Sequence, residues 1–263
     1  MEGEHPTAKQ ETVTFRFLNV IIVWLDIISA VTAGTAPRLV PDHDHELVWN
    51  HFHTKFENVI GCKVWVLIQI GRIASLHAHK TQVPAEDLST NLALQERAES
   101  IGNEIQNGLN EIALEGICLG KDGVHDNPSV STLKLTTVDE HTIVTNIYTY
   151  MASIYLHLVT HGFQHMEIIG STICAAIGML NTRVPNHLLP SLVCPLFVIG
   201  CVMPEEGQPF IRQLFSSPPL VDPLFEHRTK LLPVLEETWR RRQTTDNLSW
   251  AQVLELAPNI LPI

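Results

Sequence analysis

A long stretch of this chain carries almost no charge. Between His141 and Pro204 the only formal charges, with His counted as neutral, are Glu167 and Arg183. Apolar residues recur there at helical spacing, which predicts three helical segments that are apolar on nearly every side. Such helices lie in the middle of a large fold or in a membrane. Because Thr, Asn, Ser, His and Pro interrupt each segment, we expect a buried central bundle whose polar groups find partners.

The charge lies mostly in the rest of the chain. Its 263 residues include 28 Asp and Glu against 17 Lys and Arg, so the formal net charge is −11. An acidic surface argues against binding nucleic-acid phosphates, which requires a basic face. Hydrophobic residues make up 45% of the chain, which argues against intrinsic disorder. No direct nucleic-acid partner is therefore expected.

Helices are expected along the whole chain, because few segments alternate with the period of a strand. Pro190 and Pro195 are expected to bend or split the apolar segment that contains them. No repeat or linker divides the sequence. The predicted fold class is all-α, with a single multi-helix domain over residues 1–263 and a buried central helical bundle. The expected helices are residues 15–33, 46–57, 62–80, 84–115, 139–161, 164–180, 186–202, 208–215, 222–242 and 247–256.

The cysteines and the N-terminal residues indicate the cellular location of the protein. The five cysteines are widely spaced and form no CxxC pair, which is typical of reduced thiols in an intracellular protein. The polar start MEGEHPTAKQET is not a signal peptide. The most apolar run, residues 17–33, contains Asp26 and has about 17 residues, whereas a membrane span needs about 20. We expect no membrane span and an intracellular location, cytoplasmic or, for a regulator, nuclear.

Five segments carry a recognisable pattern. The first two are WLDIISAVTAGTAPRL (24–39) and WVLIQIGRIASL (65–76). The third is IYTYMASIYLHLV (147–159), and the fourth is LVCPLFVIGCVM (192–203) followed by EEGQPFIRQL. The fifth is LLPVLEETWRRRQ (231–243) with WAQVLEL (250–256). In this order they resemble segments of the fungus-specific transcription-factor domain, a helical regulatory domain that normally follows a zinc binuclear cluster.

The resemblance covers nearly the whole chain but not the DNA-binding half of that family. A zinc binuclear cluster requires six closely spaced cysteines, and the first cysteine here, Cys62, already lies inside the helical part. No basic linker precedes Phe15. The chain is therefore expected not to bind DNA as that family does. It is either a fragment of a longer regulator or a stand-alone derivative, and the start at Met1 favours the second.

One face of the helix expected at 139–161 combines apolar and polar residues. At 100° per residue, the shared face includes Ile147, Tyr150, Ile154, His157 and His161. These residues are suited to the wall of a ligand cavity with hydrogen-bonding groups. The alternative is that they are satisfied core residues. In the ligand-site interpretation, Tyr150 and His161 are catalytic donors, and the other three residues bind the ligand.

Asp26 is the expected catalytic base. It lies on an apolar helix, where a carboxyl group is suited to acid–base chemistry. The alternative is that Asp26 caps a neighbouring backbone segment or pairs with an arginine such as Arg72. Trp24 and Trp65 are expected as walls of the same cavity, and Gln69 as a further ligand-binding residue.

No metal or cofactor is expected. His157, His161 and His165 have metal-ligand spacing on a helix, but Gly162 is expected to end that helix first. The segment PDHDHE (41–46) is more typical of a solvated acidic turn. No Gly-rich phosphate loop, GxSxG or HExxH motif occurs. The arginine run 240–242 is expected as a solvated helix end.

Two functions are compatible with these features. The first is a cofactor-free natural-product enzyme that binds an apolar small molecule in an internal cavity and catalyses cyclisation or cycloaddition, isomerisation or dehydration. The second is the ligand-sensing part, or a modulator, of a fungal transcription factor. The missing DNA-binding half favours the enzyme. The sequence also leaves open a second copy of the chain as a partner in a homodimer.

Overall fold

The computed structural model describes residues 7–39, 57, 59–82, 88–119 and 139–257. Within these ranges the side chains are described at all positions except 7–16, 88 and 115–119. Every element in these ranges is helical, which confirms the all-α prediction. The α-helices are α1 (Thr7–Ala33), α4 (Val64–Gln82), α5 (Leu88–Leu119), α6 (Glu140–His161), α7 (Gly170–Thr182), α8 (Val193–Val202), α9 (Gln208–Phe215), α10 (Leu231–Thr244) and α11 (Trp250–Leu254). Short 3₁₀ helices are η1 (Met166–Ile169), η2 (Asn186–Leu192), η3 (Glu205–Gly207) and η4 (Pro223–Lys230).

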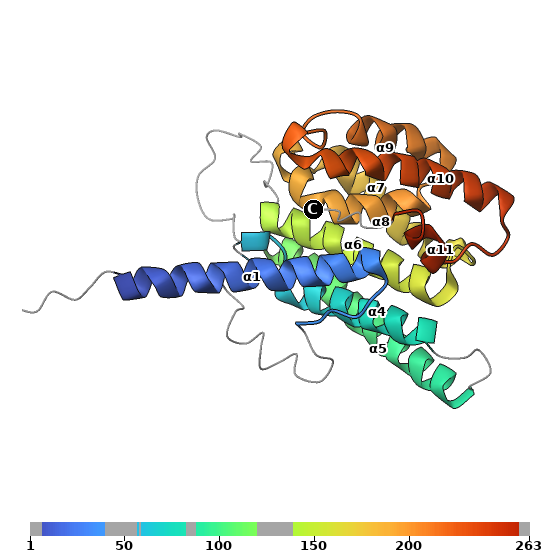
Figure 1. The fold of residues 1–263 in the computed structure, drawn as a ribbon, viewed down its shortest axis with the longest axis horizontal. Helices are drawn as coiled ribbons and strands as arrows, with labels where there is room; N and C mark the ends of the chain where they lie inside the picture. The colour runs from blue at the N-terminus through green and yellow to red at the C-terminus, as the bar shows by residue number, and fades with distance from the viewer. Residues whose placement is uncertain (1–6, 40–56, 58, 83–87, 120–138, 258–263) are drawn as a thin grey trace, which may run out of the picture.

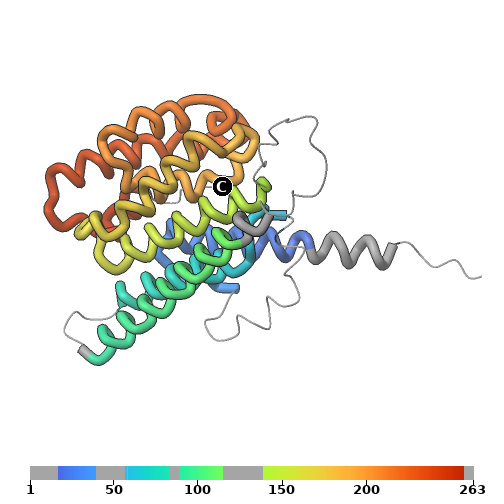
Figure 2. Tube along the Cα trace, turned by 180° about the vertical axis from the view of Figure 1, so that it is seen from behind, coloured from blue at the N-terminus to red at the C-terminus, as the bar shows by residue number. Residues whose placement is uncertain are grey.

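Helix α6 lies in the middle of the fold. It packs against α4 and α5 on one side and against α7 and α8 on the other (Figure 1). Figure 2 shows from behind that α5 and the α7–α10 layer lie on opposite sides of α6. Helices α4 and α6 run parallel, and hydrogen bonds join them at both ends. At their N-terminal ends the Lys63 backbone N–H donates to Thr145 Oγ1 (3.1 Å). At their C-terminal ends Lys80 Nζ donates to the carbonyls of Val159 (2.9 Å) and Thr160 (2.7 Å).

The core is centred on the charge-poor stretch. Every residue of α8 is buried, and the inward residues of α6 join the same hydrophobic cluster. Gly200 permits the close approach of α10 to α8, because a Cβ at this position would lie 3.1 Å from the Leu235 side chain. The predicted buried central bundle is confirmed.

Several helix boundaries differ from those expected. The segment predicted at 164–180 is interrupted because His165 adopts a left-handed conformation (φ 53°), so η1 precedes α7. The segment at 222–242 is likewise divided, since Phe225 has non-helical dihedral angles. The apolar segment at 186–202 does split as expected, into η2 and α8. The acidic turn 41–46 and nearly all of the helix expected at 46–57 lie outside the described residues.

Helix α1 contains the apolar run that was weighed as a membrane span. Its inner residues, among them Ile27 and Ile28, are buried in the core beside α4. Among the described residues no helix is both long and apolar enough to cross a bilayer.

Candidate functional site

The face of α6 predicted as a cavity wall is divided between the core and the surface. Ile147 and Ile154 are completely buried, Tyr150 is half-buried, and His161 is exposed. Burial raises the pKa of Tyr150, an effect that the charge of Arg183 partly opposes. Two surface pockets, described below, are lined by none of the sequence-predicted site residues.

Asp26 caps the chain that follows α1. Its carboxylate accepts a hydrogen bond from the backbone N–H of Leu39 at 2.8 Å. This is the structural role that the sequence set beside the catalytic one. Asp26 does not pair with Arg72, which binds Glu104 instead (2.7 Å).

Gln69 belongs to that ion pair. Its amide nitrogen donates to Glu104 (2.8 Å), and its amide oxygen accepts from Arg72 (3.0 Å). Burial by itself would raise the pKa of the Glu104 carboxyl, but the contacts with Arg72, Gln69 and Ser100 outweigh it, so that the pKa is lowered. Gln69 therefore links α4 to α5.

The two predicted tryptophan walls pack within the helical layers. Trp24 is half-buried beside the core, and its Nε1 atom is buried with no hydrogen-bond acceptor among the described residues. The Trp65 indole of α4 covers Gly108 of α5 so closely that a methyl group there would overlap the ring. The glycine thus provides the space that Trp65 occupies.

His157 supports the turn that follows α6. Its Nε2 atom lies 2.7 Å from the carbonyl oxygen of Gln164, and its ring stacks on that of His161 with centroids 4.9 Å apart. Burial lowers the pKa of both imidazoles. No cluster of three potential metal ligands occurs in the part of the chain that the structure describes.

The turn after α6 binds the segment between α10 and α11. Gly162 has a φ of 64°, and a Cβ there would lie 2.7 Å from the carbonyl oxygen of Leu248. Phe163 N–H donates to that same carbonyl (3.2 Å), and the Gln164 amide donates to Asn247. The α6 exit and the α10–α11 connection are therefore held side by side.

Helix α10 closes the C-terminal end of α8. Arg242 Nη1 donates to the carbonyls of Cys201 and Met203, each at 3.0 Å, and its guanidinium lies 5.4 Å from the Phe163 ring centroid. Trp239 Nε1 donates to the carbonyl of Gly200 (2.8 Å). Because the last carbonyls of a helix lack partners within it, Arg242 satisfies groups that would otherwise be unpaired, whereas the Gly200 carbonyl also accepts from the Met203 backbone N–H (3.2 Å).

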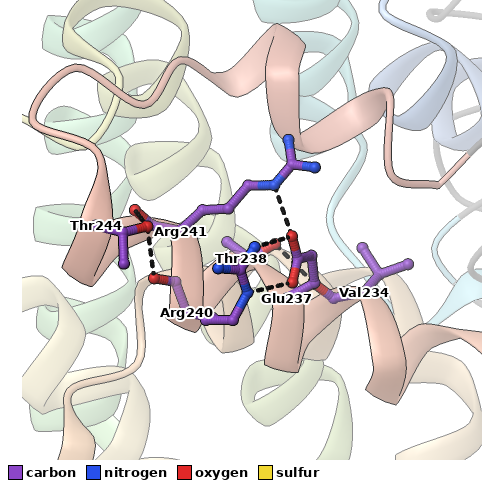
Figure 3. A network of polar contacts seen from close by, with 6 residues as sticks. All are labelled: Val234, Glu237, Thr238, Arg240, Arg241 and Thr244. Atoms are coloured by element: carbon purple, nitrogen blue, oxygen red, sulfur yellow. Dashed lines mark hydrogen bonds and ion pairs between the residues drawn. The ribbon is translucent and has the colours of Figure 1, made fainter.

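The other two arginines of the run turn outward. Arg240 and Arg241 both bind Glu237 on the exposed face of α10, at 2.7 and 2.8 Å (Figure 3). Hydrogen bonds from Arg240 and then Arg241 lower the pKa of Glu237 to about 2. The predicted solvated helix end thus describes Arg240, whereas Arg242 turns inward and is half-buried.

A pocket of about 360 Å³ opens where these elements meet. Phe163 contributes from the α6 exit, Met203 and Glu205 from the segment after α8, and Trp239 and Arg242 from α10. Asp246 contributes from the α10–α11 connection. Sequence reasoning missed this pocket because its residues come from three distant segments. A second pocket of about 350 Å³ lies between α4 and α5 and includes His79, Leu94 and Arg97.

The matches to known proteins all indicate the same protein family. The model of the fungal specific transcription factor domain matches residues 3–263. The pestheic acid cluster transcriptional regulator 3 of Pestalotiopsis fici is 37% identical over 94% of this chain and 43% of its own length. A trichothecene biosynthesis transcription regulator of Fusarium sporotrichioides is 24% identical over 91% of this chain and 52% of its own length. No solved structure gives a significant match.

These findings correct the expected function. The cofactor-free biosynthetic enzyme, whether a cyclase, isomerase or dehydratase, is the wrong interpretation, because two relatives are named as transcriptional regulators of a cluster or of biosynthesis and a third as a transcription factor. The enzyme was favoured only because the sequence contains no DNA-binding half. The chain spans only about half the length of the curated relatives it matches, so that feature does not discriminate between the two functions. The chain belongs to the fungal specific transcription factor domain family.

Proposed function

We propose that this chain is the regulatory region of a transcriptional regulator that controls a biosynthetic gene cluster. The observation that carries the proposal is the 37% identity over 94% of the chain to a protein named as a cluster transcriptional regulator. A second relative is named as a biosynthesis transcription regulator, and a third as a transcription factor. This function requires action in the nucleus, and it requires no catalytic group in the helical core.

The structure of the central bundle agrees with a regulatory role. Two polar side chains that the enzyme hypothesis needed for catalysis or ligand binding are used for capping and support: Asp26 caps the chain after α1, and His157 supports the turn after α6. A regulatory domain needs defined surfaces and a stable helical body rather than a reactive centre. A small-molecule effector and a second copy of the chain are the partners that we include in this proposal.

Deletion of the reading frame that contains this chain tests the proposal. We expect the transcripts of neighbouring biosynthetic genes to fall together, by about tenfold or more, when measured by quantitative reverse-transcription PCR. Reintroduction of the intact reading frame restores them. Unchanged transcripts with accumulation of one pathway intermediate would overturn the regulatory function, since that is the phenotype of a lost enzyme.

The proposed homodimer is tested by a separate measurement. Light scattering on the purified chain gives the mass in solution, with 29.4 kDa for one copy. A mass of twice that value supports the homodimer, and a mass equal to one copy across a wide concentration range contradicts it.

A further inference from the structure

The pocket at the C-terminal end of α8 contains acidic groups that the fold does not use. The carboxylates of Glu205 and Asp246 both line it, and neither makes a hydrogen bond or ion pair with the described part of the chain. Glu206, the neighbour of Glu205 in η3, does not line the pocket. Two carboxylates at one opening offer strong hydrogen-bond acceptors to a ligand that carries O–H or N–H groups.

The inner wall offers donors and aromatic surface. Arg242 uses Nη1 for the carbonyls of Cys201 and Met203, and its remaining N–H groups make no further hydrogen bond within the described residues. Phe163 and Trp239 supply aromatic rings to the same pocket. Arg242 lies over the Phe163 ring, and Arg212 lies over the Trp239 ring (4.9 Å). A guanidinium beside an aromatic ring favours a flat ligand with a carbonyl acceptor.

Charge and size narrow the ligand class. Two carboxylates and one guanidinium give the pocket a negative sum, so an anionic ligand is disfavoured by like-charge repulsion. A volume of about 360 Å³ is at the lower end of that of small-molecule sites, which fits a compound of about two rings. The groups present therefore match an aromatic compound that carries a hydroxyl and a carbonyl but no anionic group.

We propose that this pocket binds a hydroxylated aromatic carbonyl compound without an anionic group, with its hydroxyl donating to Glu205 or Asp246 and its carbonyl facing Arg242. The ligand would be the effector of the regulator proposed above, on which this inference rests. It would contact the α6 exit, the end of α8 and the α10–α11 connection at once. Ligand binding would thereby strengthen the contacts among these three segments.

Isothermal titration calorimetry on the whole chain tests the site with a matched set of probes. 4-Hydroxybenzophenone carries both the hydroxyl and the carbonyl, benzophenone lacks the hydroxyl, and 4-benzoylbenzoate replaces the hydroxyl with an anion. We expect the hydroxylated compound to bind at least tenfold more tightly than either of the others, because a hydrogen bond to a charged group contributes about that factor. Equal affinities, or no binding of 4-hydroxybenzophenone at 1 mM, would overturn the proposal.

Substitutions locate the binding. Glu205→Gln and Asp246→Asn are each expected to weaken the binding of 4-hydroxybenzophenone, by about tenfold for whichever accepts the hydroxyl, and the double variant by at least that factor. Glu206→Gln is the matched control from the same 3₁₀ turn and is expected to change the affinity less than twofold. All variants alter exposed side chains, so their unfolding midpoints should match the unaltered chain. Full affinity in the double variant contradicts this site.

The two proposals fail in different ways. Absent or non-specific binding, together with transcripts that still depend on the reading frame, would overturn the ligand site and leave the regulator. Specific binding together with transcripts that do not respond to deletion would overturn the regulatory role and leave a ligand site of another purpose.

Discussion

Arg242 of α10 donates from Nη1 to the carbonyl oxygen of Met203, the residue that follows α8, at a distance of 3.0 Å. The same nitrogen bonds the Cys201 carbonyl. A cation at this end also interacts favourably with the partial negative charge of the helix C-terminus. One side chain therefore caps a fully buried helix and forms a wall of the ligand pocket.

Replacement of this arginine should destabilise the fold. Arg242→Leu leaves two carbonyls without a partner, which costs about 2 kcal/mol of unfolding free energy. Arg240→Leu removes an exposed ion pair with Glu237, for which we expect a much smaller loss. Urea unfolding followed by circular dichroism compares the two variants. Equal midpoints would show that the contact at the end of α8 contributes nothing.

Gly162 is required by both conformation and space. Gly162→Ala places a methyl group at a φ of 64° and 2.7 Å from the carbonyl oxygen of Leu248. Neither the backbone strain nor the clash with a backbone atom is relieved by a side-chain rotation. We expect a loss of about 2 kcal/mol or more in unfolding free energy, measured by chemical denaturation.

Gly178 provides the matched control. It lies in the exposed face of α7, where a Cβ would meet nothing within 4 Å. Gly178→Ala is expected to stabilise the chain by about 0.5–1 kcal/mol, since alanine favours a helix interior over glycine. Destabilisation by both substitutions to the same degree would contradict the assigned role of the turn after α6.

The fold was predictable because burial follows helical periodicity. The charge-poor stretch forms α6, α7 and α8 in the expected order, and its last segment is divided into η2 and α8, with Pro190 inside η2 and Pro195 inside α8. The exact boundaries were not predictable, since the left-handed His165 and the kink at Phe225 depend on tertiary packing.

The pocket was missed for a different reason. Leu235, Trp239 and Arg242 are spaced i, i+4 and i+7, so Arg242 continues the buried stripe of α10. This pattern was overlooked because three successive arginines suggest that all three side chains are solvated. The contact partners on α8 and at the α6 exit are distant in the sequence, and no local pattern places them together.

Cysteine reactivity should follow burial. Cys62, Cys194 and Cys201 are buried, and burial raises the pKa of each thiol, which suppresses the reactive thiolate. Cys174 is exposed on α7. In a Cys118→Ser background we expect one thiol to react quickly with Ellman's reagent in the folded chain and four in urea. A second fast thiol in the folded chain would contradict the buried placement of α8 or of Cys62.

The buried imidazole of His77 should make the fold sensitive to mild acid. Burial, and then the charge of Lys80, lower its pKa from 6.5 to about 4, and its Nδ1 atom lacks a hydrogen-bond partner among the described residues. Because the folded pKa is below the unfolded one, the stabilisation is fully present above pH 6.5 and is lost as the pH falls towards 4. This shift corresponds to about 3 kcal/mol of unfolding free energy.

Urea unfolding between pH 7 and 4 tests this prediction. His77→Gln should lose less stability over this range than the unaltered chain. His79→Gln, at an exposed site on the same helix, should lose as much stability as the unaltered chain. Parallel curves for all three proteins would exclude His77 as the source of the acid sensitivity.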